Sequence, residues 1–314
     1  MTEYRIGATG PFPRTEELVQ ATRDLDRGRI SPAAAEAAFA RAEAEVADVE
    51  ERLGFDVRTG GYLRWADMFR PFTETWPGVE AGALTRFFET NTFYRQPVLR
   101  ARPEGGTGRL ATWLPDSPDH LAILPGPFTF AALAERSYAP AGPLTPVEEI
   151  AAAMTAELRS LGPRTPRQIQ FQEPMLTYRP PRGDGAEIVR AYRRLAEGLP
   201  GATISVWTYF GDVRPVLPLL DRLPVARIGF DLFESSLEGA TALHGKGIGA
   251  GVIDSRSTLA EEPREVARRV KEAVRTLGAT EVFLGPTPPL DRLPFAPAVE
   301  KLALLPALRT EIAR

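Results

Sequence analysis

Short apolar runs alternate with longer amphipathic segments along this chain of 314 residues. A short apolar run between turn residues is typical of a buried strand, whereas apolar positions that recur with a helical period are typical of a helix. The runs therefore predict eight strands, at residues 5–10, 56–61, 121–126, 168–174, 203–210, 227–233, 247–254 and 281–287. The run at 56–61 is the weakest of them.

The clearest helix signal covers residues 31–54, where Ser31 suits the N-cap, Pro32 the first helical position and Gly54 the C-cap. Further helices are predicted at residues 146–161 and 261–278, and at 297–314 with a kink or restart at Pro306. This alternation of strands and helices predicts an α/β fold, a (β/α)8 TIM barrel. We find no linker, so a single domain over residues 1–314 is predicted.

Residues 66–115 do not follow the strand–helix repeat and are rich in aromatic side chains. We expect them to form an excursion after the second strand, such as a hairpin over one end of the barrel. The aromatic part, from Trp65 to Tyr94, could serve either as a lid or as a dimer surface.

Composition excludes several classes of function. The chain has no cysteine, which excludes disulfides, iron–sulfur clusters, thiolate zinc sites and cysteine nucleophiles. The net charge is -3, so no bulk field favours nucleic acid or an anionic membrane surface. No apolar run in the sequence is long enough to cross a bilayer. The first residues do not have the pattern of a signal peptide. We therefore predict a cytoplasmic protein that binds neither nucleic acid nor membranes.

In a barrel of this kind the active site lies at the carboxyl ends of the strands. His120 precedes the third predicted strand and His244 the seventh, so both are expected at the opposite end. Histidine acid–base catalysis is therefore not predicted. The candidates at the correct end are Pro11, Phe12, Arg14, Tyr62, Arg64, residues 125–127, Gln172, Glu173, Thr208, Tyr209, Asp231, Asp254, Arg256 and Thr287.

Eight short motifs follow one another in an order and spacing that resemble one family. They are GATGPFPRTEEL, GGYLRWADMFRPF, NTFYRQPV, LPGPFTFAAL, QFQEPML, WTYFGDV, FDLFES and GIGAGVIDSRSTLAEEPREV. Together they resemble cobalamin-independent methionine synthase, in the short form that consists of the catalytic barrel alone. The resemblance implies a (β/α)8 barrel with its site at the strand carboxyl ends.

The family transfers a methyl group to homocysteine through a zinc-bound thiolate. Its histidine and first cysteine ligands fall at Thr208 and Phe210, its glutamate at Asp231 and its last cysteine at Pro288. Three of the four positions carry groups that bind zinc poorly or not at all. The resemblance therefore implies a divergent member without the zinc site. A hard ion held by Asp231, Glu173 and Asp254 is the alternative.

The homocysteine site is changed as well. The two acidic residues that bind the homocysteine ammonium in the family fall at Tyr62 and Gln172, which are neutral, and the serine of the opening motif falls at Pro11. A buried ammonium needs a compensating charge. Homocysteine is therefore not the predicted substrate.

Other family positions are kept. Arg14, Asp67, Glu173 and Asp254 match the motifs, although Glu173 and Asp254 could instead support neighbouring backbone. The aromatic residues at the rim, together with Arg256, suit a flat and partly anionic ligand. Trp207 could instead point into the barrel wall, since neighbouring strand residues face opposite ways.

Three functions are compatible with these observations. The first is a metal-free enzyme that transfers a methyl or alkyl group, or performs a related reaction, on a small non-thiol substrate. The second is a non-catalytic relative, either a partner of a methyltransferase or corrinoid protein or a binder of a folate- or corrinoid-like ligand. The third is an ordinary homocysteine methyltransferase.

For the first function, the predicted proton-transfer residues are Glu173, Tyr209, Asp231 and Asp254. A folate- or corrinoid-linked methyl donor would be its co-substrate. The predicted substrate-binding residues are Arg14, Tyr62, Gln172, Trp207, Thr208 and Arg256.

Overall fold

The computed structural model describes residues 2–139 and 142–313. Its main sheet is parallel and curled, with the strand order β1-β10-β9-β8-β7-β6-β4. In this sheet Ile6 pairs with Leu284, and Phe171 pairs with Val206. The strands are β1 (Glu3–Ile6), β4 (Leu121–Pro125), β6 (Gln168–Gln172), β7 (Thr203–Trp207), β8 (Arg227–Asp231), β9 (Gly247–Asp254) and β10 (Glu281–Thr287). Each of them overlaps a predicted strand region, and β1 begins two residues before the predicted run at 5–10.

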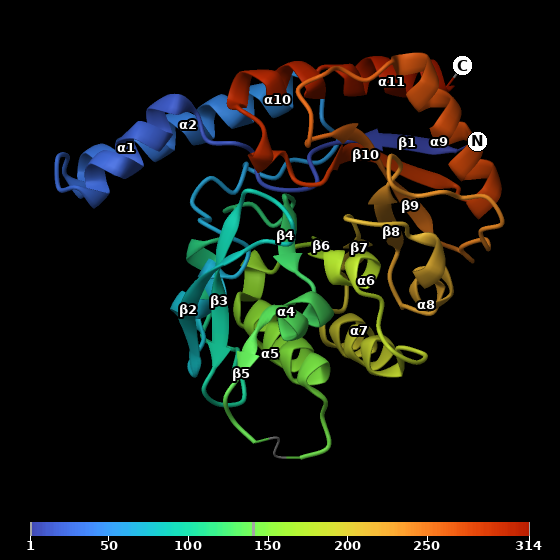
Figure 1. Cartoon of the computed structure of the whole chain (residues 1–314). Coiled ribbons are helices and arrows are strands. Elements are labelled where there is room, and N and C mark those ends of the chain that lie inside the picture. The colour runs from blue at the N-terminus through green and yellow to red at the C-terminus, as the bar shows by residue number, and fades with distance from the viewer. Residues whose placement is uncertain (1, 140–141, 314) are drawn as a thin grey trace.

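Helices cover the sheet, with α2, α10 and α11 on one side and α4, α5 and α7 on the other (Figure 1). Short 3-10 helices lie at 109–112, 162–164, 214–216 and 290–292. The helices are α1 (Glu16–Asp26), α2 (Pro32–Arg52), α3 (Arg70–Thr75), α4 (Pro127–Leu133), α5 (Pro146–Ser160), α6 (Pro174–Tyr178), α7 (Ala186–Gly198), α8 (Leu217–Asp221), α9 (Pro263–Leu277), α10 (Phe295–Leu302) and α11 (Leu304–Ala313).

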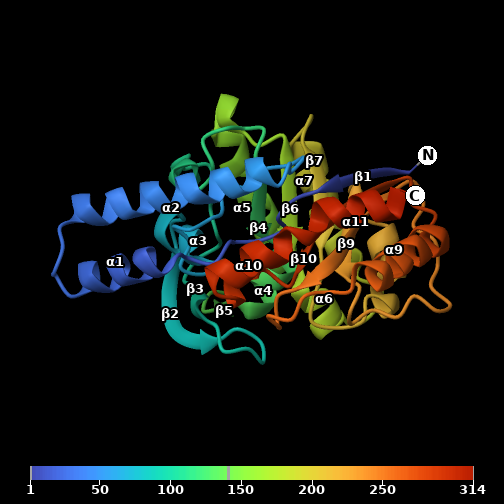
Figure 2. The same cartoon turned by 90° about the horizontal axis from the view of Figure 1, so that it is seen from above.

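The capping signals act as the sequence predicts. The Ser31 hydroxyl accepts a hydrogen bond from the amide of Ala34 at 3.2 Å, and Pro32 is the first residue of α2. The C-terminal segment forms two helices, and Pro306 lies in the first turn of the second one, where its missing N–H is tolerated. Figure 2 shows α1 and α2 projecting together beyond the sheet.

The aromatic-rich segment contains an antiparallel pair, β2 (Val79–Arg86) and β3 (Phe93–Leu99). With β5 (Glu135–Arg136) this pair makes a separate three-stranded sheet. The connection between β2 and β3 places the ring of Phe87 6.2 Å from that of Phe210, which follows β7. The segment therefore contacts the main sheet at the carboxyl ends of its strands.

The predicted strand at 56–61 is wrong. Its one ladder contact among the described residues is an isolated parallel bridge between Gly7 and Val57. Gly60 and Gly61 have φ values of 68° and 79°, which extended strands do not adopt. Glu50 accepts hydrogen bonds from the amide and hydroxyl of Thr59, both at 2.8 Å, and this draws the backbone towards α2.

The same segment nevertheless lies between the two edge strands of the curled sheet. The amide of Asp56 donates to the carbonyl of Ile6 at 3.0 Å, and the amide of Leu121 donates to the carbonyl of Arg58 at 2.8 Å. Residues 56–58 therefore connect β1 to β4 by single hydrogen bonds where the described strands form no continuous ladder.

Candidate functional site

A cavity of about 1260 Å³ opens at the carboxyl ends of β1, β4, β6, β7 and β10. In α/β folds built on parallel strands, ligands bind at this end. The polar residues that line the cavity include Arg14, Glu16, Glu17, Gln20, Arg23, Glu45, Tyr62, Asp67, Thr92, Gln172, Tyr209, Asp291 and Arg292. Four of the ten predicted site residues, Arg14, Tyr62, Gln172 and Tyr209, are in this lining. We take this cavity as the candidate site.

Arg292 supplies a positive charge to the cavity wall. Its guanidinium carbon lies 4.7 Å from the ring centre of Phe210 and 5.8 Å from that of Phe87. Its Nε is buried, and among the described residues the guanidinium has no hydrogen-bond or ion-pair partner. Burial lowers the pKa of Arg292, an effect that the neighbouring Asp291 partly offsets. Arg292 is thus a partly buried cation held by two aromatic rings.

Asp291 lines the cavity beside Arg292. Its side chain is accessible through the cavity, but the surrounding protein still desolvates the carboxyl group and raises the pKa of Asp291, against the attraction of Arg292. A carboxylate with a raised pKa is a better proton acceptor than an ordinary aspartate.

Tyr209 is the one predicted catalytic residue that reaches the cavity. Its backbone carbonyl accepts a hydrogen bond from the Thr177 hydroxyl at 2.6 Å, which fixes the main chain, while its own hydroxyl has no hydrogen-bond partner in the described part of the chain. Burial raises the pKa of Tyr209 above its ordinary value. At neutral pH the phenol therefore stays protonated and can donate a hydrogen bond.

Three predicted substrate-binding residues also line the cavity. Arg14 donates to the carbonyls of Leu63 at 2.9 Å and Trp65 at 3.4 Å, so part of its guanidinium holds the loop after residue 61. The amide nitrogen of Gln172 donates to the carbonyl of Thr9 at 2.6 Å. The oxygen of this side-chain amide, Oε1, is buried without a partner among the described residues.

Tyr62, the third of these residues, bridges to β4. Its hydroxyl donates to the carbonyl of Leu121 at 2.9 Å and accepts from the amide of Ile123 at 2.8 Å. Its φ is 54°, an unusual value for a bulky residue. Since both hydrogen-bonding functions of the hydroxyl are used, only the ring faces the cavity.

Glu173 lies outside the cavity lining. Its carboxylate is fully buried and accepts hydrogen bonds from the amides of Phe128 at 3.0 Å and Thr129 at 2.7 Å and from the hydroxyl of Tyr192 at 3.0 Å. Burial raises the pKa of Glu173 to about 7, although these donors favour the charged form. Glu173 therefore supports the start of α4, which was the architectural alternative.

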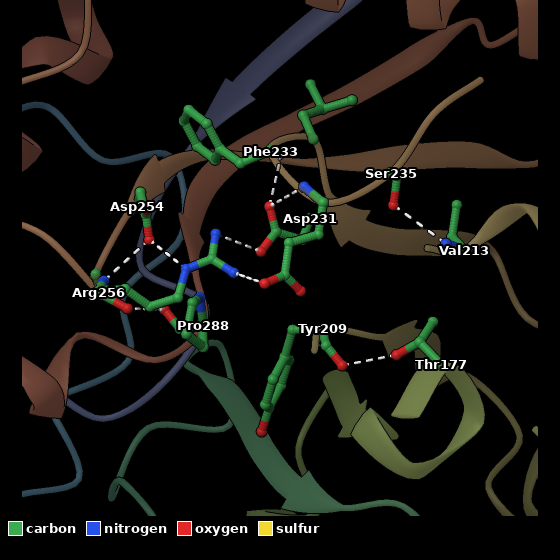
Figure 3. Close-up of polar contacts among 12 residues, drawn as sticks. Thr177, Tyr209, Val213, Asp231, Phe233, Ser235, Asp254, Arg256 and Pro288 are labelled. Atoms are coloured by element: carbon green, nitrogen blue, oxygen red, sulfur yellow. Dashed lines mark hydrogen bonds and ion pairs between the residues drawn. The ribbon is translucent and has the colours of Figure 1, made fainter. Parts of the chain in front are cut away.

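Asp231, Asp254 and Arg256 form one ion-pair group, drawn in Figure 3. Nη2 of Arg256 lies 3.0 Å from Oδ2 of Asp231, its Nε lies 2.7 Å from Oδ1 of Asp254, and its Nη1 contacts Glu234. Asp231 also accepts from the amide of Phe233 at 2.7 Å. Burial raises the pKa of Asp231 to about 7 against the attraction of Arg256. These groups are engaged with one another and lie outside the cavity lining, so we assign them to loop structure.

Trp207 and Thr208 also lie outside the lining. The ring of Trp207 fills the interior of the sheet, where a Cβ at Gly229 or Gly249 would overlap it. The Thr208 hydroxyl donates to the carbonyl of Gly229 at 3.1 Å. Trp207 is therefore a buried packing residue that does not face the cavity.

The residues at the family's zinc positions do not fit a zinc ion. The hydroxyl of Thr208 is engaged with backbone, Asp231 is paired with Arg256, and the carbonyl of Pro288 accepts from the Ser255 hydroxyl at 2.7 Å. Across residues 2–139 and 142–313, no group of three or more His, Cys, Asp or Glu side chains is arranged to hold a metal ion. Since Glu173 is engaged elsewhere, the hard-ion alternative does not fit either.

The profile described as "Cobalamin-independent synthase, N-terminal domain" matches residues 74–278. This chain belongs to the cobalamin-independent methionine synthase family. The match covers well over half of the chain, as the order of motifs predicted. Because the profile is that of the N-terminal domain, the residue correspondence with the zinc-binding catalytic barrel stays a prediction.

Two curated relatives illustrate the range of the family. The chain is 26% identical over 308 residues to a protein named methionine synthase from Sulfurisphaera tokodaii, covering 93% of this chain and 88% of the relative. It is 30% identical over 183 residues to 5-methyltetrahydropteroyltriglutamate–homocysteine methyltransferase from Mycobacterium tuberculosis. That match covers 55% of this chain and 24% of the relative, so the chain spans about a quarter of the mycobacterial protein.

Solved structures share the fold. A B12-independent methionine synthase from Shewanella sp. W3-18-1, in complex with selenomethionine, superposes with a TM-score of 0.75 at 16% identity, covering 100% of this chain and 97% of that one. A putative vitamin-B12 independent methionine synthase from Listeria monocytogenes gives 0.74 at 15% identity, covering 99% and 98%. Within the described residues, none of the helices combines the length and the apolar character that crossing a membrane requires.

Sequence reasoning missed Asp291 and Arg292. A signal was present, because both follow the eighth predicted strand, but the candidates from that strand stopped at Thr287. The structure places both residues in the cavity lining.

Proposed function

We propose that this protein is a methyltransferase-like enzyme that binds a small non-thiol substrate in the cavity and transfers a methyl or alkyl group to it without zinc. The observation that carries the proposal is a cavity at the strand ends lined by Tyr209, Asp291 and Arg292, whose side chains form no hydrogen bond or ion pair with another side chain among the described residues. Family membership supports the class of reaction. The poor fit of the zinc positions supports an acceptor other than a thiol.

We also propose that residues 1–314 form one domain, a (β/α)8 barrel that residues 56–58 close between β1 and β4. The hydrogen bonds from this segment to Ile6 and Leu121 support the closure. The β2–β3 pair would then be the excursion over the open end, with Phe87 in the cavity wall.

The cavity volume suits a transfer between two bound molecules. Sites for one small molecule usually measure about 300–1,000 Å³, and this cavity is about 1260 Å³. A methyl donor, such as a folate- or corrinoid-linked methyl group, and an acceptor could therefore be bound together. Close and aligned binding of both reactants is itself a large part of catalysis.

The proposed step is a direct displacement. A lone pair on the acceptor forms the bond to the methyl carbon, and the electron pair of the broken bond leaves with the donor. The acceptor's proton passes to the carboxylate of Asp291, whose pKa is raised. The neutral phenol of Tyr209 donates a hydrogen bond to the atom on which negative charge develops.

The test is a transfer assay with isotope-labelled 5-methyltetrahydrofolate or methylcobalamin as donor. Amine, hydroxyl, carboxylate and thiol acceptors are compared, with homocysteine among the thiols. Label in a non-thiol product, lost in Asp291→Asn and reduced in Tyr209→Phe, supports the proposal. Transfer to homocysteine alone, dependent on added zinc, contradicts it.

A second candidate is a non-catalytic relative that binds a folate- or corrinoid-like ligand or partners a methyltransferase or corrinoid protein. It is favoured by one observation, that Glu173, Asp231 and Asp254 all support the fold instead of facing the cavity. Saturable binding of either donor, with no labelled product from any acceptor, would select it.

A further inference from the structure

We infer that Arg292 is an anion-binding residue and that the ligand of this cavity carries a planar oxyanion, a carboxylate, held end-on by the guanidinium. This inference rests on the proposed function, since it takes the cavity as the substrate site. It adds the chemical class of the substrate and one residue that recognises it.

Arg292 differs from the other arginines near the strand ends. Arg256 is surrounded by Asp231, Asp254 and Glu234, and Arg14 donates to two backbone carbonyls. Arg292 has no hydrogen-bond or ion-pair partner among the described residues, although it is partly buried and lines the cavity. Asp291 attracts Arg292 without forming an ion pair, so the charge of this desolvated cation is only partly compensated, and a bound anion would complete the compensation.

The orientation of the guanidinium selects the kind of anion. Nε is buried without a hydrogen-bond partner, and neither terminal nitrogen is among the buried unpaired atoms of the described residues. Because Arg292 lines the cavity, we infer that it presents Nη1 and Nη2 there. The rings of Phe210 and Phe87 hold the group at 4.7 and 5.8 Å from their centres. Two parallel N–H groups on a fixed plane match the two oxygens of a carboxylate. The unpaired phenol of Tyr209 can donate a further hydrogen bond.

The charged and titratable groups that act electrostatically on Arg292 are Asp291, Tyr209 and Arg256. Asp291 opposes an anion in the cavity, because its carboxylate lines the same wall. The two neighbouring residues therefore have opposite effects on anion binding. Neutralising Arg292 weakens it, and neutralising Asp291 strengthens it. A purely structural role for Arg292 does not produce this reversal.

The experiment measures binding of benzoate, benzamide and inorganic phosphate by calorimetry to the full chain, as wild type, Arg292→Gln, Arg292→Lys and Asp291→Asn. We expect benzoate to bind more tightly than its neutral isostere benzamide and more tightly than phosphate. Loss of a charged hydrogen bond predicts benzoate binding weaker by roughly 10- to 100-fold in Arg292→Gln. Arg292→Lys should be intermediate, and Asp291→Asn should bind benzoate more tightly than wild type.

Equal benzoate affinity in wild type and both Arg292 variants overturns the inference, as does preferential binding of benzamide. Tighter binding of phosphate overturns the assignment to a carboxylate. If Arg292→Gln does not fold, Arg292→Lys and Asp291→Asn still provide the comparison. The two proposals fail separately. Arg292-dependent benzoate binding without methyl transfer removes the proposed function alone, whereas methyl transfer with Arg292-independent benzoate binding removes this inference alone.

Discussion

Replacing Glu173 by glutamine separates an architectural role from a catalytic one. The carboxylate is fully buried, and three donors, the amides of Phe128 and Thr129 and the hydroxyl of Tyr192, converge on it. Glutamine has the same shape but presents an NH2 group to at least one of these donors. A buried donor left without an acceptor costs about 1–3 kcal/mol, so Glu173→Gln should be less stable than wild type by this amount at pH 5.

A second effect of Glu173 depends on pH. Its pKa rises from an ordinary value of 4.5 to about 7 in the folded protein, chiefly through burial. Between these values the folded state binds more protons than the unfolded state, so the stability contributed by this group is complete below pH 4.5 and is lost as the pH rises towards 7. At about 1.4 kcal/mol per pKa unit, the loss is about 2–3 kcal/mol between pH 5 and pH 8. Glutamine cannot titrate, so the variant should lack this loss.

The assay is urea unfolding of wild type and Glu173→Gln at several pH values from 5 to 8, followed by circular dichroism. Tyr192→Phe is the matched control, because it removes one donor and leaves the carboxyl group able to titrate. Parallel stability–pH curves for wild type and Glu173→Gln would refute the reasoning. If Glu173→Gln keeps the stability of wild type but loses activity, Glu173 has a catalytic role.

Three further predictions follow from the contacts around the site. Arg256→Gln leaves the buried Asp231 without its partner and should lower the free energy of unfolding by about 3 kcal/mol in urea titrations; an unchanged midpoint would show that the pair adds nothing. Tyr62→Phe removes two buried hydrogen bonds to β4 and should cost about 1–3 kcal/mol, measured as a lower Tm, whereas an equal Tm would remove the bridge from the account. Native mass spectrometry with added zinc should show no tight one-to-one complex. One retained zinc ion would refute the conclusion that the residues at the family's zinc positions do not bind zinc.

Local signals were sufficient for the seven strands of the main sheet and for its clearest helices. Apolar runs and caps depend on residues close in sequence, which is why the strand around Leu121 and the helix after Ser31 could be placed from sequence alone. The strand prediction for residues 56–61 failed because a hydrogen bond to Glu50 draws the backbone towards α2 and because the two glycines take positive φ values. An apolar pattern does not contain that information.

By itself, the sequence determined the α/β alternation, the family, and the exclusion of cysteine chemistry, because these depend on residue type and order. The tertiary structure decided which strand-end residues are free to act. Glu173, Asp231 and Arg256 all lie near strand ends, but partners from other loops satisfy their charges. Arg292 remains unpaired among the described residues. Whether a polar group is available depends on neighbours distant in sequence, and only folding brings those neighbours together.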